Sequence, residues 1–329
     1  MNNNLIQITD NIFQIILTYN NTRPSNAYLI NKDKTILIDT GHPFQDSILL
    51  LEKALMDLGL GFRDIDYIIY THPHIDHVGG GLILRKNYKR IKHIAHINAK
   101  YCLKYFNETY HELLDLSKKF IDFKGLGAPD DVIQAAKHYI GTHYLLGHDL
   151  SITTDQTIKD GDILKLGQTE LHIYYTPSHS FCDISLYEPE QKILFSGDFI
   201  LENGTTLLSI LGGSTIEEGM LSLKKVQDLD IDLILSGHGN KIMHPYKSIE
   251  SSKRYYQRIR SKILRILHQD KRTVSEIVFY ALNGNISANN YLIWYRLLLI
   301  VNTHLDQLLK ENKIITLARN NKIYYDISP

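Results

Sequence analysis

The hydrophobic pattern of the first 70 residues predicts strands, then a helix, then another strand. Residues 46–60 place apolar side chains three or four positions apart, which is typical of a helix, and Asp66–Tyr70 is a short run typical of a buried strand. Before them, four short runs rich in β-branched residues lie between polar turn clusters and predict strands: Leu5–Ile8, Ile12–Thr18, Ala27–Ile30 and Thr35–Ile38.

A change of pattern at residues 98–150 interrupts the strands. Helical spacing at 99–120 and 130–140, around a glycine-containing link, favours an inserted helical lid. The strand pattern then resumes, with one helix predicted at Thr215–Leu229. The strands expected after the insert are Ile163–Leu166, Glu170–Thr176, Ile184–Tyr187, Lys192–Phe195 and Ile231–Leu235.

The last 80 residues are dominated by helical spacing. They predict three helices and a closing β-hairpin: Ile249–His268, Val274–Leu282, Ala288–Lys310, then Ile314–Ala318 and Lys322–Asp326. Helices followed by a hairpin are typical of a winged-helix module. We therefore expect an α/β domain at residues 1–248 and a winged-helix-like α domain at residues 249–329.

Composition excludes several classes of protein. The chain has 329 residues, of which 43% are hydrophobic and 22% charged, so it can bury a large core and is not disordered. Only Cys102 and Cys182 are present, which excludes a disulfide scaffold. Because the N-terminus lacks a secretory pattern and the apolar stretch Tyr291–Val301 is broken by Arg296, we expect a cytoplasmic protein without a membrane span.

Charge is distributed unevenly although the net charge is zero. Residues 250–329 hold 13 Lys and Arg against 6 Asp and Glu, a net charge of +7. The chain holds 36 of each kind, so residues 1–249 carry 23 against 30, a net charge of −7. The basic C-terminal region is either a solvated surface that pairs with the acidic body or a surface for nucleic acid.

A cluster of histidines follows the strand predicted at residues 66–70. His72, His74, Asp76 and His77 lie within six positions. In an extended loop, residues i and i+2 point the same way, so we expect His72 and His74 to converge on one ion. Asp76 and His77 lie past the turn and are expected to face a second ion.

Three further candidate ligands each follow a predicted strand: His179, Asp198 and His238. An α/β scaffold collects functional residues at strand ends along one sheet edge. Imidazole and carboxylate ligands suit Zn²⁺, and two ions about 3.5–4 Å apart can share a hydroxide while a carboxylate bridges them. We therefore predict a site for two divalent ions, with Zn²⁺ as the expected metal and Fe or Mn as alternatives.

These motifs, in this order, resemble those of the metallo-β-lactamase superfamily. Asp39, in the segment Leu37–Gly41, matches the first motif of that family, and the resemblance covers residues 26–240. It implies an αββα sandwich with metals at one edge. The C-terminal helices and hairpin are similar to the branch of β-lactamase-like protein 2 and glyoxalase II-like hydrolases.

The resemblance also implies a role for each residue. Asp198 would bridge the two ions, and Asp39 would orient the ligand loop without binding metal. Asp76 would be both a ligand and the catalytic residue that orients the hydroxide or shuttles a proton. The implied ligand sets are His72, His74 and His179 for one ion, and Asp76, His77 and His238 for the other.

The third motif departs from the family pattern. Many relatives read Thr-Pro-Gly-His, then Ser or Thr, then Pro-Gly-His, whereas this chain reads Thr-Pro-Ser-His-Ser-Phe-Cys-Asp over residues 176–183. The ligand His179 is retained. Both glycines, the second proline and the second histidine are replaced, which affects the shape of the loop beside the substrate.

The resemblance implies a dinuclear metal-dependent hydrolase in which a metal-bridging hydroxide attacks a small or medium ester, thioester or lactone. His143, Tyr144 and His148, in the predicted lid, are candidate substrate contacts. A β-lactam is the least favoured substrate, because no export signal is present. Flavodiiron redox chemistry is disfavoured because His74 stands where those relatives usually carry Glu.

Two other functions stay open at this point. One is a metal-dependent ribonuclease or phosphodiesterase that binds nucleic acid through its basic C-terminal region. The other is a metal-bearing signalling or binding protein with little turnover. The expected partner is a small-molecule substrate, and the sequence also allows a homodimer.

Overall fold

Two β-sheets form the centre of the molecule in the computed structural model. It describes residues 4–19, 23–106, 108–109, 151–202, 204–205, 214–284, 291–320 and 322–329. The first sheet has the spatial order β1 to β7 and is antiparallel from β1 to β4 and parallel from β4 to β7. Its strands are β1 (Leu5–Gln7), β2 (Ile12–Leu17), β3 (Ser25–Asn31), β4 (Thr35–Ile38), β5 (Tyr67–Tyr70), β6 (Lys92–His96) and β7 (Gln156–Ile158).

The second sheet has the order β14-β11-β10-β9-β8, and only its β11–β14 pair is parallel. Its strands are β8 (Ile163–Leu166), β9 (Thr169–Tyr175), β10 (Ile184–Glu188), β11 (Ile193–Gly197) and β14 (Leu233–Ser236). A short hairpin, β12 (Ile200–Leu201) and β13 (Gly204–Thr205), follows β11. Both sheets are therefore mixed.

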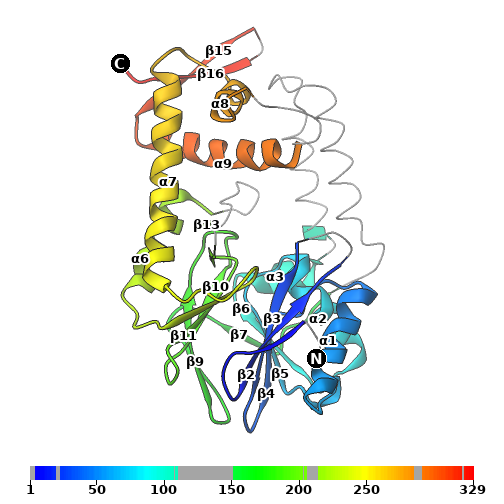
Figure 1. Cartoon of the computed structure of the whole chain (residues 1–329). Coiled ribbons are helices and arrows are strands. Elements are labelled where there is room, and N and C mark those ends of the chain that lie inside the picture. The colour runs from blue at the N-terminus through cyan, green and yellow to red at the C-terminus, as the bar shows by residue number, and fades with distance from the viewer. Residues whose placement is uncertain are drawn as a thin grey trace.

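Helices cover the outer face of each sheet (Figure 1). In β4, Ile36 and Ile38 face the second sheet while Leu37 packs with the helices, as the strand period of two requires. The helices over the first sheet are α1 (Gln45–Asp57), α2 (Ile75–Asn87) and α3 (Ala99–Lys104), with a 3₁₀ turn, η1, at Phe62–Asp64. Helices α6 (Ile216–Gln227) and α7 (Pro245–Leu267) pack over the second sheet. The expected αββα sandwich is confirmed.

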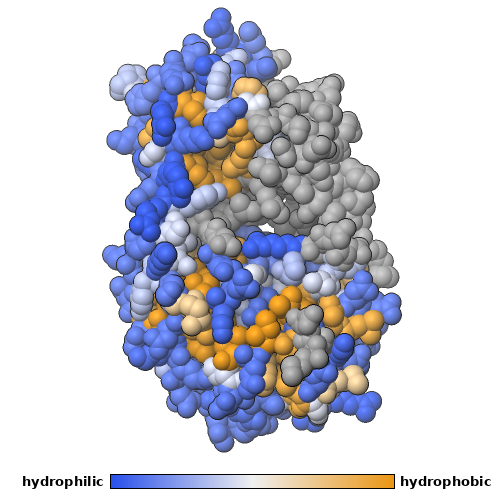
Figure 2. All heavy atoms as spheres, viewed as in Figure 1, coloured by the Kyte–Doolittle hydropathy of each residue, from blue (hydrophilic) through white to orange (hydrophobic). Residues whose placement is uncertain are grey.

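Helix α7 runs from the sandwich into the C-terminal region (Figure 1). There its second half packs with α8 (Val274–Ala281), α9 (Tyr291–Lys310) and the hairpin of β15 (Ile314–Arg319) and β16 (Lys322–Ile327) around a separate apolar cluster. Figure 2 shows hydrophilic side chains along the outer edge that α7 occupies. The helices and hairpin predicted here are present within the described residues, and a winged-helix arrangement of them stays a prediction.

Helix α2 was not predicted, and neither were β6 and β7. Gly79, Gly80 and Gly81 lower the helix propensity of this segment. Tertiary packing nevertheless favours the helix: a Cβ on Gly80 would lie 2.3 Å from the Thr40 carbonyl oxygen, and one on Gly81 would lie 1.9 Å from the Tyr70 hydroxyl. The glycines let α2 approach the sheet closely, and this burial outweighs their low propensity.

The predicted lid lies mostly outside the described residues. Only Asn98, α3 and the few residues after it belong to the described part of residues 98–150. The lid, with His143, Tyr144 and His148, therefore stays a prediction. Within the described part of the chain, no helix is both long and apolar enough to cross a membrane.

Candidate metal centre

Seven predicted ligands come together at one edge of the sandwich. His72 and His74 follow β5, and α2 begins at Ile75, so Asp76 and His77 lie in its first turn rather than in an extended loop. The other three lie in loops of the second sheet: His179 between β9 and β10, Asp198 after β11, and His238 after β14.

The first group consists of His72, His74 and His179. One nitrogen of each ring lies within 4.8 Å of one nitrogen of each of the others, close enough to share an ion. His74 Nδ1 is 2.8 Å from His179 Nε2, and the His72 and His74 ring centroids are 4.6 Å apart. These three residues are the set that the family resemblance implies for one ion.

The second group consists of Asp76, His77 and His238, whose ligand atoms also lie within 4.8 Å of one another. Asp76 Oδ2 is 3.3 Å from His238 Nε2 and 3.8 Å from His77 Nε2. The set coincides with the residues expected around the other ion.

Asp198 lies between the two groups. Its Oδ2 is 3.6 Å from His179 Nε2 and 3.2 Å from His238 Nε2, and its Oδ1 is 3.4 Å from His77 Nε2. One carboxylate therefore faces members of both groups. That is the placement required of a bridging ligand.

Three buried atoms in this cluster indicate that the site fits cations. His72 Nε2, His77 Nε2 and Asp198 Oδ1 are buried, and none has a hydrogen-bond partner among the described residues. Burying a polar atom without a partner costs about 1–3 kcal/mol. His77 Nε2 and Asp198 Oδ1 offset part of this cost because they face each other at 3.4 Å, whereas His72 Nε2 lacks a hydrogen-bond partner among the described residues. Divalent ions would satisfy all three, because His72 Nε2 and Asp198 Oδ1 offer lone pairs and His77 Nε2 offers one once its proton is displaced.

Asp39 orients His72 and His77 through the Nδ1 side of each ring, away from the nitrogens that face the site. Its Oδ2 accepts hydrogen bonds from His77 Nδ1 at 2.8 Å and from the Thr71 hydroxyl at 2.7 Å. Because that hydroxyl donates to Asp39, it accepts from His72 Nδ1, at 3.0 Å. Both rings therefore present Nε2 to the site. Asp39 adopts a positive φ of 57°, which is uncommon for a residue with a side chain.

Replacing Asp39 with asparagine is expected to weaken metal binding by about 10- to 100-fold, as for other residues that orient ligands. The amide of the new side chain would have to place its NH₂ group against Thr71 or His77, where the native carboxylate accepts. Competition with a chromogenic chelator measures the change. Asp66→Asn is the matched control, because Asp66 accepts a hydrogen bond from the Thr35 amide at the start of β4 and β5, whereas Asp39 lies at the other end of these two strands. An equal loss of metal affinity in both variants would contradict the orienting role of Asp39.

Burial and mutual charge set the protonation of the cluster. Burial lowers the pKa of His72 well below its usual value, so this ring is neutral. Burial by itself would raise the pKa of Asp198, but His238 and His77 hold it well below its usual range. Burial also opposes protonation of His77, yet the carboxylates around it, Asp76 first, raise its pKa to about 9. An ion that binds His77 must therefore displace a proton.

Two orienting contacts were missed by the sequence analysis. Thr71 joins Asp39 to His72, and its position directly before the histidine motif was the available signal. His238 Nδ1 donates to the Pro24 carbonyl oxygen at 2.5 Å, across 214 positions of sequence. No sequence pattern links residues so far apart.

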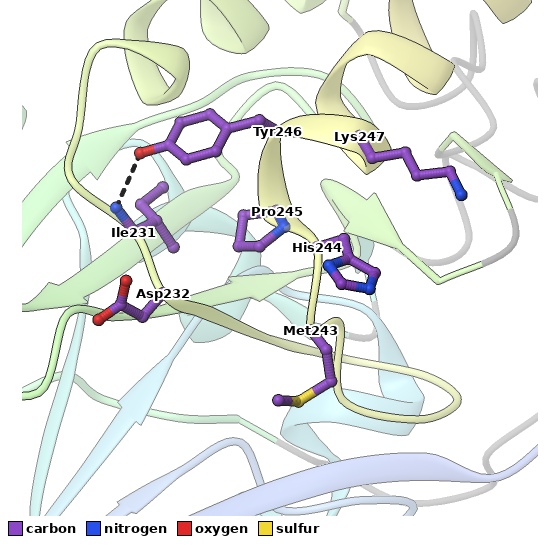
Figure 3. Close-up of a pocket in the computed structure, with 7 residues that line it drawn as sticks. All are labelled: Ile231, Asp232, Met243, His244, Pro245, Tyr246 and Lys247. Carbon is purple, nitrogen blue, oxygen red and sulfur yellow. Dashed lines mark hydrogen bonds between the residues drawn. The ribbon is translucent and has the colours of Figure 1, made fainter.

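An open hollow of about 300 Å³ lies elsewhere on the molecule, at the start of α7 (Figure 3). Met243, His244 and Lys247 line one side, and the Tyr246 hydroxyl accepts a hydrogen bond from the Ile231 amide at 3.1 Å. The hollow shares no lining residue with the histidine cluster. We therefore place the candidate site at the cluster.

Comparison with known proteins agrees with the geometry. The sequence model of the metallo-beta-lactamase superfamily matches residues 20–238. The chain is 28% identical over 253 residues to a beta-lactamase-like protein 2 homolog from Caenorhabditis elegans, covering 76% of this chain and 68% of the relative. It is 23% identical over 210 residues to the acyl-coenzyme A thioesterase MBLAC2 of Gallus gallus, covering 56% and 68%.

The fold is also similar to a solved structure over nearly its whole length. A metallo-beta-lactamase family protein from Thermus thermophilus superposes with a TM-score of 0.76 at 18% identity. The match covers 98% of this chain and 100% of that protein, so it includes the C-terminal region. At this identity the likeness concerns the fold alone.

Proposed function

Because the chain belongs to the metallo-beta-lactamase superfamily and is a metallo-hydrolase with the His and Asp clusters typical of a dinuclear site, we propose that it hydrolyses a small or medium ester, thioester or lactone. One observation carries the proposal: three overlapping groups of three ligands. His72, His77 and Asp198 form the group that joins His72, His74 and His179 to Asp76, His77 and His238. Their chemistry suits Zn²⁺ first, with Fe and Mn as alternatives.

His72, His74 and His179 would hold one ion, Asp76, His77 and His238 the other, and Asp198 both. When bound, such ions supply Lewis acidity and lower the pKa of water toward neutrality. Asp76 is the more exposed carboxylate, with 23% of its side chain exposed against 8% for Asp198. This exposure supports Asp76 as the residue that would orient the attacking water and hold its proton, while Asp39 and Thr71 would keep the rings aligned.

A thioester is the first substrate to test, because a relative of this chain is named an acyl-coenzyme A thioesterase. The Zn²⁺-loaded protein should be assayed with an acyl-coenzyme A, an aryl ester, a lactone and a β-lactam. We expect turnover of the thioester or ester, its loss after chelation, and its recovery on adding Zn²⁺. Full activity in a verified metal-free sample would contradict the proposal.

We also propose that residues 1–248 form the catalytic domain and that 249–329 form a winged-helix-like module. One feature of this region favours a second candidate function, hydrolysis of nucleic acid. Lys247, Arg254, Arg258 and Arg265 are exposed and spaced seven, four and seven positions apart, which places them on one face of α7. None of the four forms an ion pair within the described ranges.

If the protein hydrolyses nucleic acid, the four exposed basic residues of α7 are expected to bind the phosphate backbone. The affinity for a single-stranded oligonucleotide should then fall steeply with salt, and the double variant Arg254→Glu/Arg258→Glu should reduce the slope by about 2. The double variant Lys53→Glu/Lys89→Glu, at exposed lysines of the sandwich, is the control. Absence of binding at low salt would remove the nucleic-acid candidate and leave the ester hydrolase.

A further inference from the structure

The loop that carries His179 is held by side chains that the family pattern does not provide. It spans residues 176–183 and connects β9 to β10. Glycine supplies backbone freedom in a tight loop, but the glycine positions of the usual motif are Ser178 and Cys182 in this chain. A loop of this composition needs other contacts to keep the histidine in one place.

Asp183 stabilises the loop through two hydrogen bonds to Ser180, which belongs to the same loop. Its side chain is almost fully buried, with 2% of the residue exposed. Its Oδ2 accepts a hydrogen bond from the Ser180 amide at 2.7 Å, and its Oδ1 accepts one from the Ser180 hydroxyl at 2.5 Å. Ser180 directly follows His179, so both carboxylate oxygens act on the residue next to the predicted ligand.

The same segment connects the loop to the first sheet. Ile184, the residue after Asp183, donates its amide hydrogen to the Thr71 carbonyl oxygen at 3.0 Å. Thr71 directly precedes His72, which belongs to the same group as His179. Asp183 therefore completes a short path of hydrogen bonds between two members of the first group, although they come from different sheets.

Tyr175 holds the loop from the other side. Its hydroxyl donates to the Phe181 carbonyl oxygen at 2.6 Å and accepts from Asn98 Nδ2 at 3.4 Å. Its ring stacks on His96 with centroids 4.6 Å apart and planes 3° from parallel. His96 and Asn98 lie at the end of β6, so this contact ties the loop to the edge of the first sheet.

We propose that Asp183 and Tyr175 are positioning residues that hold His179 in place for the first ion. Asp183 sets the conformation of the loop, and Tyr175 anchors that conformation to the first sheet. The inference rests on the proposed function, because it takes His179 as a metal ligand. The inference goes beyond that function by naming two residues that affect the binding of one ion and not of the other.

The test is a titration of the metal-free full-length protein with Zn²⁺ in competition with a chelator, together with the visible spectrum of the Co²⁺-loaded protein. Asp183→Ala is expected to weaken the binding of one of the two ions by about 10- to 100-fold, which is typical of losing a residue that holds a metal ligand in place. The other ion should bind as in the wild type. Tyr175→Phe should weaken the same ion, and Asp183→Asn, which keeps one acceptor oxygen, should restore most of the affinity.

Asp162→Ala is the matched control. Asp162 accepts a hydrogen bond from the Lys159 amide at 2.9 Å, with the same three-residue spacing as Asp183 and Ser180, in the turn before β8. This variant should bind both ions normally and leave the Co²⁺ spectrum unchanged. A control that behaves like Asp183→Ala would overturn the inference.

Two results for Asp183→Ala itself would also overturn it: both ions bound as tightly as in the wild type, or both weakened equally. These outcomes are separable from failure of the proposed function. A wild-type chain that binds no ion would overturn the metal site and this inference together. A wild-type chain that binds two ions, with variants that do the same, would overturn the inference alone.

Discussion

Asp198→Ala is expected to reduce the binding of both ions and to lower turnover by about 10³-fold or more. Asp198 faces both groups, at 3.6 Å from His179 Nε2 and 3.2 Å from His238 Nε2. A divalent pair supplies several kcal/mol of transition-state stabilisation, and each 1.4 kcal/mol or so is worth a factor of ten in rate. Without the carboxylate between them, the two positively charged ions would also repel each other more strongly.

Elemental analysis of the purified variant measures bound metal, and the ester or thioester assay measures turnover. Asp228→Ala, at an exposed aspartate that directly follows α6, is the control and should match the wild type in both measurements. Circular dichroism should show that Asp198→Ala stays folded. A folded variant that retains two ions and its turnover would show that Asp198 does not bridge them.

Gly237→Ala is expected to have the second-largest effect, with loss of about 10²-fold or more in kcat/KM. A Cβ at this position would lie 2.3 Å from Asp198 Oδ1 and 2.7 Å from His77 Cε1, so both side chains must move. Displacing a catalytic group by about 1 Å can cost about this much in rate. The backbone of Gly237 does not have a positive φ, so the effect comes from space rather than backbone strain.

Gly61→Ala separates this steric effect from the general cost of replacing a glycine. A Cβ on Gly61 would meet its nearest atom, Asp64 Oδ2, at an ordinary 3.8 Å. The control should keep wild-type metal content and activity, while Gly237→Ala should lose affinity at the ions that Asp198 and His77 contact. Unchanged metal affinity in Gly237→Ala would mean that the site tolerates displacement of these two side chains.

The elements that the sequence predicted well are those with a local signal. Strands such as β2 and β4 are apolar and β-branched, and Thr215 caps the start of α6 with the capping box that its sequence contains. Helix α2 was missed because its stability comes from packing its glycines against Thr40 and Tyr70, which a local pattern does not reveal.

The site shows the same division. All seven predicted ligands lie together, because each follows a strand whose end lies at one edge of the sandwich. The supporting contacts were harder to predict. Pro24 reaches His238 across the two sheets, and Asp183 holds the residue after His179 through a loop whose sequence departs from the usual motif.

The sequence by itself determined the chemistry of this protein: the types of ligand, their order along the chain and the alternation of strands and helices. These depend on residue identity and short-range spacing, which are written directly in the chain. The tertiary structure decided how those ligands are aimed, through Asp39, Thr71 and the Pro24 carbonyl, and where glycine is required. Orientation depends on hydrogen bonds and close approaches between segments that lie far apart in the chain, 214 positions in the case of Pro24 and His238, and these exist only once both sheets have packed.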